Sequence, residues 1–514
     1  MLSLRKAAAA AALTLGTLAY SSPALAGDFI DTRVTFLFSD DNIFAGPADF
    51  SPQPDFTQRP GVNTFFDNYN TRDSGQETKT DLAVYKRMTG WNPRLETEAA
   101  FLIRFDLYAD AVTGQGSQTF ADDGTYIQVN WLKGEIKEGG SAPGRPPRLY
   151  FLGFPFNADR MRLGYSYGIT WGGREIFPKN SSPVPGMKFG YDGSTWYVYG
   201  GAKTHRQLND NTNNIETEYA FLGGAGVDVN PMVRIEGAAG YFQKGALPPI
   251  GPSDPLAGER INASGFTGQV TLHQGLPIIG SVDIRLYRND PDFPFNAFAK
   301  ENYGPGLSWL LSSEVSVLTQ NLRDPDTFGQ TVIQPAMAGD INAKVKTGYT
   351  IAYGDVVYRS LSFILFNVPA FTPYYAFPKG AQVAPQTFLD LGVSHYFPNG
   401  HQTPGFVFGY EKPATYTGDT TGAGLPGSNT VVVRQQGNFT ILPPGQTAFD
   451  ILSARVYDRV ELSDMLTGIG QITYTLDKNA TQLERGPGGI PVRVFKGNNV
   501  TNQLAIAAIF QARW

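Results

Sequence analysis

The feature that most constrains this fold is an alternation of apolar and polar side chains in segments of about ten residues. From Leu95 to Leu107 the odd positions carry Leu, Thr, Ala, Phe, Ile, Phe and Leu, whereas the even positions carry Glu, Glu, Ala, Leu, Arg and Asp. A period of two places alternate side chains on opposite faces of a β-strand. The segment is long for a soluble strand and suits a tilted strand that crosses a bilayer.

The same alternation recurs along the chain, and turn sequences separate the segments. Thr89–Pro93 (TGWNP) precedes the segment at Leu95, and Asp192-Gly193-Ser194 separates another pair. Asp-Gly between such runs is a strong hairpin signal, so neighbouring segments are expected to pair as antiparallel strands. The further segments lie at 80–88, 126–133, 187–191, 195–203, 219–227, 235–241, 282–287, 341–353, 389–397, 406–410, 449–457 and 466–476.

A closed barrel is the membrane fold that this pattern allows. No run of about 18 apolar residues, which a membrane helix needs, follows residue 26. Hydrocarbon cannot satisfy backbone N–H and C=O groups, so only helices and edge-free barrels cross it. We therefore predict an all-β fold: a single antiparallel transmembrane β-barrel of about 18 strands (roughly 16 to 20), with long loops on one side and an aqueous lumen. No fixed-period repeat favours a propeller or solenoid instead.

The first 26 residues have the order of a cleaved signal peptide. Arg5 and Lys6 form a short basic region, residues 7–20 are apolar, and Ala24-Leu25-Ala26 supplies the small residues that a signal peptidase accepts. An N-terminal anchor is the alternative. The expected domains are residues 1–26 as signal peptide and residues 27–514 as an outer-membrane β-barrel.

Composition excludes several functions for the exported chain. There is no Cys, which rules out disulfides, thiolate metal sites and a Cys nucleophile. Loss of Arg5 and Lys6 leaves 41 − 2 = 39 basic against 46 acidic residues, a net charge of −7, so no nucleic-acid partner is expected. A soluble all-β secreted protein could share this composition.

No catalytic constellation is visible in the sequence. The four histidines, listed last, stand in no spacing with Ser, Asp or metal ligands that indicates chemistry, and the Gly-rich stretch 168–173 lacks the Lys of a phosphate loop. Glu96 and Glu98 could mimic a carboxylate pair but are better explained as neighbours on one charged face. We expect no enzyme activity, no cofactor and no metal. The histidines are His205, His273, His395 and His401.

The C-terminus supplies an independent indication of a barrel. Leu504, Ile506, Ala508, Phe510, Ala512 and Trp514 form an alternating apolar face that ends on the final residue. This strand resembles the terminal signal of bacterial outer-membrane barrel proteins, which ends in an aromatic residue. The resemblance implies that Phe510 and Trp514 act as an assembly signal for the barrel-assembly machinery and that outer-membrane lipid surrounds the protein. Trp514 departs from the more usual Phe. A soluble domain that ends on a strand is the alternative.

Barrel size and Gly/Pro-rich loops resemble those of porins and of alginate-export-type polysaccharide-export barrels. Both classes imply passive movement of a hydrophilic solute or a polysaccharide through a polar lumen. No motif separates them. A barrel that anchors a secretion, adhesion or motility assembly, with partners from an envelope complex, would have almost the same sequence.

The polar faces of the segments nominate side chains for the lumen, because a charge on the lipid face costs up to about 4 kcal/mol at the membrane midplane. Solvated ion pairs that merely keep the lumen wet are the alternative role for each of them. The expected lumen-facing residues are Glu96, Glu98, Arg104, Arg234, Glu236, Asp283, Arg285, Lys344, Lys346 and Arg455.

Long loops are the other functional candidates. Residues 45–75 precede the regular hairpins and hold several aromatic residues, so they are the best candidate for a plug or inserted loop. The aromatic cluster Phe371–Tyr375 suits a membrane interface better than a sugar-stacking site. Further long loops are expected at 172–186, 245–260, 289–305, 367–385 and 412–428.

Overall fold

The structure is a computed structural model of the whole chain. The residues it describes are 30–44, 77–106, 120–122, 124–134, 147–156, 161–173, 184–209, 211–276, 278, 303–366, 374–419, 428–433, 439–497 and 501–514. The expected signal peptide, the plug candidate at 45–75 and the strand at 282–287 lie outside these residues.

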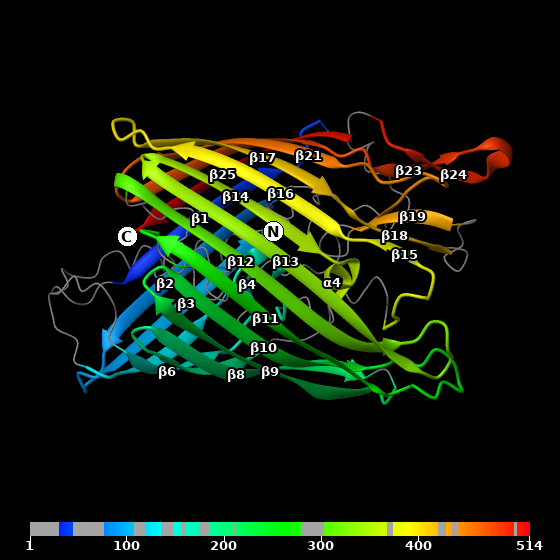
Figure 1. Cartoon of the computed structure of the whole chain (residues 1–514), viewed down its shortest axis with the longest axis horizontal. Helices are drawn as coiled ribbons and strands as arrows, with labels where there is room; N and C mark the ends of the chain where they lie inside the picture. Colours follow the sequence, from blue (N-terminus) through cyan, green and yellow to red (C-terminus); the bar gives the residue numbers. More distant parts are fainter. Residues whose placement is uncertain are drawn as a thin grey trace, which may run out of the picture.

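Antiparallel strands form the wall of a closed barrel (Figure 1). In chain order they are β1 (Asp31–Asp40), β2 (Glu77–Thr89), β3 (Leu95–Asp106), β4 (Phe120–Asp122), β5 (Tyr126–Leu132), β6 (Arg148–Phe154), β7 (Gly186–Asp192), β8 (Trp196–Asn209), β9 (Asn214–Asn230), β10 (Val233–Ala246), β11 (Arg260–Gln274), β12 (Gly304–Arg323), β13 (Thr331–Gly348), β14 (Thr350–Arg359), β16 (Gln386–His395), β17 (Gln402–Lys412), β21 (Ile451–Glu461), β22 (Leu466–Leu476) and β25 (Asn502–Arg513).

The barrel closes because the first strand pairs with the last. β1 pairs antiparallel with β2 on one side and with β25 on the other. The sheet has 19 strands, but β4 and β5 both pair with β3 along different parts of its length and act as one wall strand, which gives a closed 18-strand barrel. The prediction of an antiparallel barrel of about 18 strands is confirmed.

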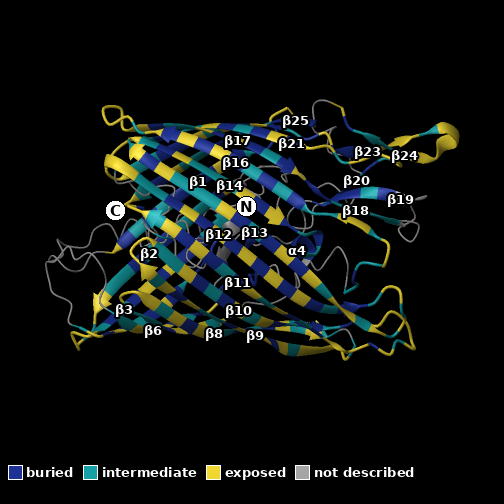
Figure 2. Ribbon diagram, in the orientation of Figure 1, coloured by how far each residue is buried: buried dark blue, intermediate teal, exposed yellow. Residues whose placement is uncertain are grey.

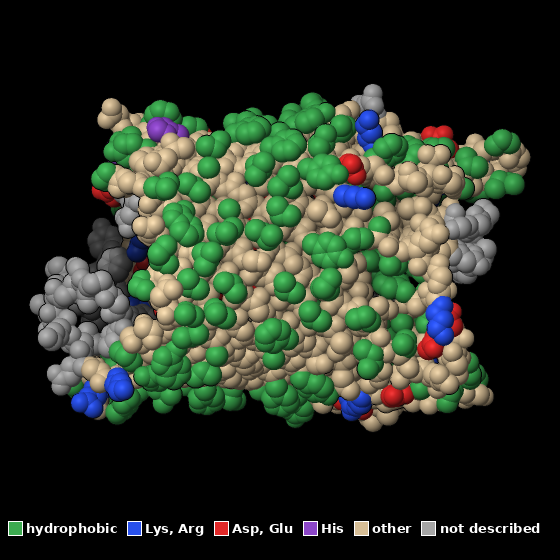
Figure 3. Space-filling view, viewed as in Figure 1, with side chains coloured by type: hydrophobic (Ala, Val, Ile, Leu, Met, Phe, Trp, Pro, Cys, Tyr) green, Lys and Arg blue, Asp and Glu red, His purple; other side chains and the backbone are tan. Residues whose placement is uncertain are grey.

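The two faces of the wall follow the alternation in the sequence (Figure 2). On β3, Glu96 and Glu98 are buried on the inner face, whereas the Phe101 side chain, on the outer face, is 50% exposed. The visible side of the barrel is rich in hydrophobic side chains between its ends, and charged side chains gather toward both ends (Figure 3). An apolar band flanked by polar ends is the surface expected of a barrel that spans a bilayer.

Most of the tight turns lie at one end of the barrel. Two to six residues join β7 to β8, β9 to β10, β16 to β17 and β21 to β22, and the seam between β1 and β25 ends on the same side. We call this the short-turn end. The opposite end, which we call the long-loop end, carries the connections from β1 to β2 and from β6 to β7. Long connections are not confined to it: 29 residues join β11 to β12 at the short-turn end, whereas four residues join β8 to β9 at the long-loop end. The prediction of long loops on one side therefore holds only in part.

A small extra sheet extends beyond the wall at the long-loop end (Figure 1). Its strands β15 and β18 continue β16 and β17 in unbroken register, but Pro385 and Pro413 interrupt the two ladders at the same level. Proline donates no backbone N–H, so ladder pairing weakens here. The sheet comprises β15 (Gln382–Ala384), β18 (Ala414–Asp419), β19 (Ser428–Val433) and β20 (Phe439–Ile441); β23 (Thr481–Arg485) and β24 (Pro491–Phe495) form a separate hairpin.

The helix α4 (Leu361–Phe366) packs between this sheet and the barrel wall. Leu361, Ile364 and Leu365 form a buried cluster with Val431 and Val433 of β19. Among the described residues, no helix is long and apolar enough to span a membrane.

One expected strand is in fact a hairpin. The alternation at 341–353 predicts a single segment, but the chain reverses at Gly348, whose φ is 53°, between β13 and β14. The reversal exchanges the faces: Ile341 is exposed on the outer wall, whereas Ile351 is buried inside. A period-two pattern cannot reveal such a reversal, because apolar residues of two hairpin strands can keep the same parity along the chain.

Candidate functional site: the barrel lumen

Part of the connection between β6 and β7 folds into the barrel. We call residues Met161–Gly173 the lumen segment. Leu163 and Trp171 exchange two backbone hydrogen bonds of 2.9 Å, and the Arg162 Nε donates to Thr170 Oγ1 at 3.0 Å, so the segment is a compact turn. Leu163, Ile169 and Trp171 have no exposed surface.

The tip of the lumen segment is tied to β12, β13 and β14. The backbone N–H groups of Tyr165 and Ser166 donate to the Glu314 carboxylate on β12, at 3.0 and 2.5 Å. The Ser166 hydroxyl donates to Asp340 on β13. Arg359 of β14 donates to the Gly168 carbonyl at 3.3 Å. These bonds satisfy polar groups that are buried or half-buried inside the barrel.

The flank of the lumen segment is tied to β8, β10 and β11. Trp171 donates from Nε1 to Thr267 Oγ1 at 2.8 Å, and its ring lies 5.5 Å from the ring of Phe242. The fully buried Lys203 donates from Nζ to the Gly172 carbonyl at 2.5 Å. The segment therefore leaves the wall beside β6 and runs inside the barrel along the inner faces of β8 to β14. We call this inward-folded turn the chord.

Sequence reasoning missed this segment. The sequence shows residues 168–173 only as a Gly-rich stretch without the Lys of a phosphate loop, and it predicts a long loop at 172–186. It does not indicate that Gly172 and Gly173, at the start of that loop, are buried inside the barrel. The segment has no alternation and few charges, and Trp171 is buried only because strands distant in sequence surround it. Sequence reasoning also missed the four wall residues that hold the segment, whose contacts with it join parts of the chain distant in sequence: Lys203, Glu314, Asp340 and Arg359.

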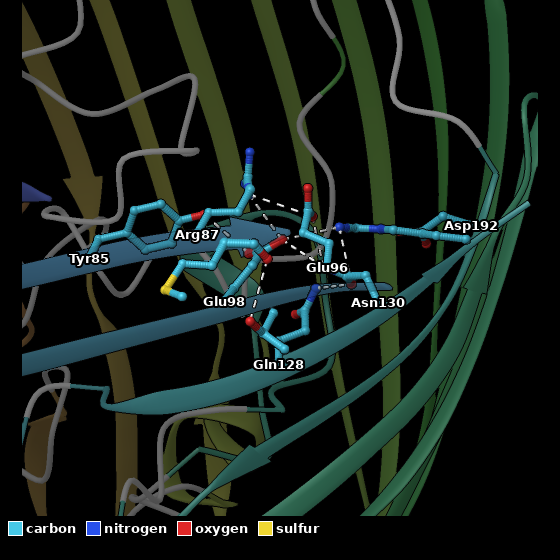
Figure 4. Close-up of polar contacts among 10 residues, drawn as sticks. Tyr85, Arg87, Glu96, Glu98, Gln128, Asn130 and Asp192 are labelled. Carbon is cyan, nitrogen blue, oxygen red and sulfur yellow. Dashed lines mark hydrogen bonds and ion pairs between the residues drawn. The ribbon is translucent and has the colours of Figure 1, made fainter. Parts of the chain in front are cut away.

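An ion-pair network lines the lumen near the short-turn end (Figure 4). The Arg87 Nε lies 3.3 Å from Glu98 and 3.6 Å from Glu96, and Arg148 NH1 lies 3.6 Å from Glu98. Glu98 also accepts hydrogen bonds from the Tyr85 hydroxyl (3.2 Å) and from Asn130 Nδ2 (2.8 Å). This carboxylate is 3% exposed, and four partners compensate for its burial.

The network continues around the wall. Asn130 Nδ2 also donates to Glu96, at 3.0 Å, and Gln128 donates to Asn130 at 2.7 Å. On its other side Arg148 pairs with Asp192 at 2.9 Å. Side chains from β2, β3, β5, β6 and β7 thus form one connected polar surface on the inner wall.

A second charged group lies on β9 and β10. Arg234 makes a bidentate pair with Asp228, at 2.6 and 3.0 Å, and Glu236 accepts a hydrogen bond from the Tyr197 hydroxyl at 2.8 Å. The Tyr197 hydroxyl in turn lies 3.4 Å from that of Tyr165 in the lumen segment. Through Tyr197, the second charged group therefore contacts the lumen segment.

The remaining nominated residues are dispersed. Arg455 is buried on β21, where its Nε donates to Thr473 at 2.8 Å. Lys344 and Lys346 share the inner face of β13, and Arg104 lies on the inner face of β3. Asp283 and Arg285 lie outside the described residues. The nominated charges thus fall into two groups and several separate positions.

The two aromatic residues of the expected assembly signal lie at the seam. Phe510 faces outward on β25, directly opposite Phe36 of β1, and both are about half exposed. Trp514 closes the seam by exchanging backbone hydrogen bonds with Thr32, at 2.9 and 3.0 Å.

Within the described part of the chain, no group of three or more His, Asp or Glu side chains could hold a metal ion. Two of the histidines contact neighbouring oxygen atoms: the His273 Nδ1 lies 2.8 Å from the Leu276 carbonyl, and the His395 Nδ1 lies 2.8 Å from Thr350 Oγ1. His205 is buried on β8, and His401 lies in the turn between β16 and β17.

Comparison with known proteins gives a likeness of class. No protein-family model matches the chain, and no curated protein matches it. Outer membrane protein OpdK of Pseudomonas aeruginosa, solved with vanillate, is 7% identical over 94% of this chain and 98% of that chain, with a TM-score of 0.42. A BenF-like porin from Pseudomonas fluorescens Pf-5 is 9% identical over 95% and 99%, with a TM-score of 0.43.

Wzi of Escherichia coli is a third similar structure. It is described as an outer membrane protein involved in group 1 capsule assembly and as a carbohydrate-binding β-barrel. It is 10% identical over 94% of this chain and 84% of that chain, with a TM-score of 0.42. The resemblance to outer-membrane porin-like β-barrels is at the level of class.

Proposed function

We propose that this chain is an outer-membrane channel for the passive passage of small hydrophilic solutes, and that the lumen segment narrows the passage. The observation that carries the proposal is that the lumen segment occupies part of the barrel interior, beside a charged inner wall. Barrels of 16 to 18 strands are too wide for wall side chains to fill, so they hold water.

The distribution of polar groups supports a wet interior. Carboxylates, guanidinium groups and amides line the inner wall, whereas the outer wall exposes side chains such as Phe101 and Phe189. Desolvating so many charges would be costly unless they were paired or hydrated. The signal peptide expected at 1–26 and the C-terminal strand support export to the outer membrane.

The chord sets which part of the wall a solute meets. The lumen segment covers β8–β13 with Leu163 and Trp171, and carboxylates and backbone groups hold it in place. The passage then runs along the inner faces of β16, β21 and β3, where Arg455 and Glu96 lie. A narrowed passage favours small solutes over a polymer chain.

A barrel scaffold is the second candidate. The small sheet and the β23–β24 hairpin extend beyond the wall at the long-loop end, where a partner protein could bind (Figure 1). On the hairpin, Leu483 is 44% and Ile490 is 67% exposed.

Conductance across planar bilayers separates the two candidates. The wild-type protein should give stable single-channel conductance. Replacing Arg162–Gly172 with a short Gly-Ser linker should raise that conductance about twofold or more, because it removes the chord. A matched control shortens the β23–β24 hairpin at residues 486–490, outside the barrel, and should leave conductance unchanged. Silence of both the wild type and the linker variant, with correctly folded protein, would overturn the channel and favour the scaffold.

A further inference from the structure

Two inward-facing tyrosines lie flat against the barrel wall. Tyr353 of β14 is paired directly with Gly392 of β16, and the face of its ring lies on that glycine so closely that a Cβ at Gly392 would collide with it. Tyr457 of β21 covers Gly405 of β17 in the same way. Because one face of each ring rests on a glycine, the opposite face is turned toward the lumen.

The two rings form one continuous surface. Gly392 and Gly405 lie on neighbouring strands and only two positions apart in the register, because Gly405 pairs with Ser394. The Tyr353 and Tyr457 side chains share a hydrogen bond, so the ends of the rings meet over β16 and β17. Both tyrosines are only half-buried. They therefore make a flat aromatic surface on the inner faces of β14 to β21, which we call the tyrosine platform.

Polar side chains of opposite charge flank the tyrosine platform. Asp390 of β16 and Arg455 of β21 both interact electrostatically with the Tyr353 hydroxyl. Asp390 accepts the backbone N–H of Asp355 at 3.2 Å, and the Arg455 Nε donates to Thr473 Oγ1 at 2.8 Å. A carboxylate and a guanidinium group are therefore both held beside the platform.

The platform lies on the proposed route through the barrel. The lumen segment meets β14 at Arg359, whose guanidinium donates to the Gly168 carbonyl at 3.3 Å. Tyr353 precedes Arg359 on this strand, which begins at the short-turn end. A solute that enters at the long-loop end and passes the tip of the lumen segment therefore reaches the platform.

We propose that the tyrosine platform, together with Asp390 and Arg455, binds the ring of a monosaccharide on its way through the channel. This inference rests on the proposed function as a channel for small hydrophilic solutes. The face of an aromatic ring carries partial negative charge, so it attracts the weakly positive C–H groups on the flat face of a pyranose. Sugar hydroxyl groups both donate and accept hydrogen bonds, so they match a carboxylate and a guanidinium group together.

The mixed charge beside the platform favours a neutral solute. A carboxylate solute would be attracted by Arg455 but repelled by Asp390, and the reverse holds for an ammonium solute. An acyclic polyol carries the hydroxyl groups but has no flat apolar face to lie on the rings. A neutral cyclic sugar is the solute that gains from the rings and from both polar groups.

Block of the ion current by D-glucose tests the site. The full-length protein is reconstituted in planar bilayers, and the current through many channels is followed as glucose is added. A sugar on the platform fills part of the passage, so the current should fall to a saturating level. The variant Tyr353→Ala/Tyr457→Ala should raise the half-saturating glucose concentration about tenfold or more, because it removes both stacking surfaces. D-mannitol should cause only the small, linear loss that follows from viscosity.

Two control variants make the result specific. Tyr474→Ala removes an outward-facing tyrosine of β22 and should leave the glucose titration unchanged. Tyr353→Phe/Tyr457→Phe keeps both ring faces and should keep most of the affinity. The gel mobility of unheated samples verifies that each variant is folded.

The outcomes separate the site from the channel. A wild-type current that glucose lowers no more than mannitol does, or a half-saturation that the Ala variant leaves unchanged, overturns the monosaccharide site while the channel stands. Absence of any wild-type current overturns the channel. Equilibrium dialysis of the folded protein in detergent with labelled glucose then decides the site by itself: binding that the Ala variant loses supports it, and absence of binding overturns it.

Discussion

Tyr165 donates its backbone N–H to both carboxylate oxygens of Glu314, at 3.0 and 3.1 Å, across 149 positions of sequence. Glu314 is 1% exposed and also accepts the N–H of Ser166. A single wall carboxylate therefore satisfies two successive backbone donors of the lumen segment, which would otherwise be buried without acceptors.

Replacing Glu314 by Ala should release the tip of the lumen segment. Each buried donor left without an acceptor costs about 1–3 kcal/mol, so the tip loses about 2–6 kcal/mol of attachment. We expect larger and noisier single-channel conductance than in the wild type. The control is Glu484→Ala on the exposed β23. An unchanged conductance trace for Glu314→Ala would show that other contacts alone position the segment.

One carboxylate adds a side-chain ion pair across the seam of the barrel. Asp31 of β1 makes a bidentate pair with Arg33, with two bonds of 2.9 Å, and accepts a third bond from Arg513 of β25 at 2.7 Å. Asp31→Ala leaves the buried Arg33 without this partner, which costs about 3–5 kcal/mol. The temperature at which the folded band disappears in unheated gel electrophoresis should fall. Asp464→Ala, in the exposed β21–β22 turn, should not change it; equal midpoints for the two variants would contradict a role for the seam pair.

The wall of the barrel was predictable because its signal is local. In β3 the alternation alone separates Glu98, which faces the lumen, from Phe101, which faces outward. β12 has an equally regular pattern, with Leu311 and Val315 exposed and Ser312 and Glu314 buried, yet it was not among the predicted segments. The alternation in β12 therefore indicates a wall strand as clearly as the alternation in β3 does.

The chord was not predictable, because its signal is not local. Trp171 is buried by Phe242 and Thr267, which lie on strands that follow it by 70 residues or more. The local amino-acid sequence around Trp171 does not distinguish an aromatic residue inside a barrel from one in a surface loop. The prediction of a single strand at 341–353 was wrong for a different reason. The alternation there continues through the turn at Gly348, so the pattern does not reveal the hairpin.

The ion pair between Arg323 and Asp254, which we call the loop clamp, predicts that the stability of the β10–β11 loop depends on pH. Arg323 donates two hydrogen bonds to Asp254, at 3.0 and 2.6 Å, and lowers the Asp254 pKa from 3.8 to about 2, with help from the Leu256 and Ile250 backbone N–H groups. Because the folded pKa lies below the unfolded one, the clamp stabilises the loop fully above about pH 4 and loses that contribution as the pH falls toward 2.

Pepsin digestion measures this loss, because pepsin is active over that range. Cleavage within 247–259 of the wild type should be slow at pH 4 and should approach the rate of Asp254→Asn as the pH nears 2. Comparing the two proteins at each pH cancels the changing activity of the protease. A wild-type loop cleaved as fast as the variant loop at pH 4 would show that the pair does not hold the loop.

A charge placed on the outer wall tests which face of the barrel contacts lipid. Phe101→Arg places a guanidinium in the apolar band, at a cost of up to about 4 kcal/mol at midplane. The matched variant Gln471→Arg adds the same side chain to the inner face of β22. Phe101→Arg should lower the folded fraction recovered in vesicles, as judged by gel mobility without heating, and Gln471→Arg should not. Equal losses would contradict the assignment of the two faces.

Tyr150 lies directly opposite Gly190 on the neighbouring strand, and its ring covers the glycine so closely that a Cβ at Gly190 would collide with it. Gly190→Ala should therefore destabilise the wild-type barrel by about 1–3 kcal/mol through overpacking. In a Tyr150→Ala background the collision is absent, so the same change should cost little, and the double-mutant cycle should show strong coupling. Gly470→Ala, where a Cβ meets nothing within 4 Å, is the control. Additive changes in the guanidinium unfolding midpoint would mean that the ring moves aside without cost.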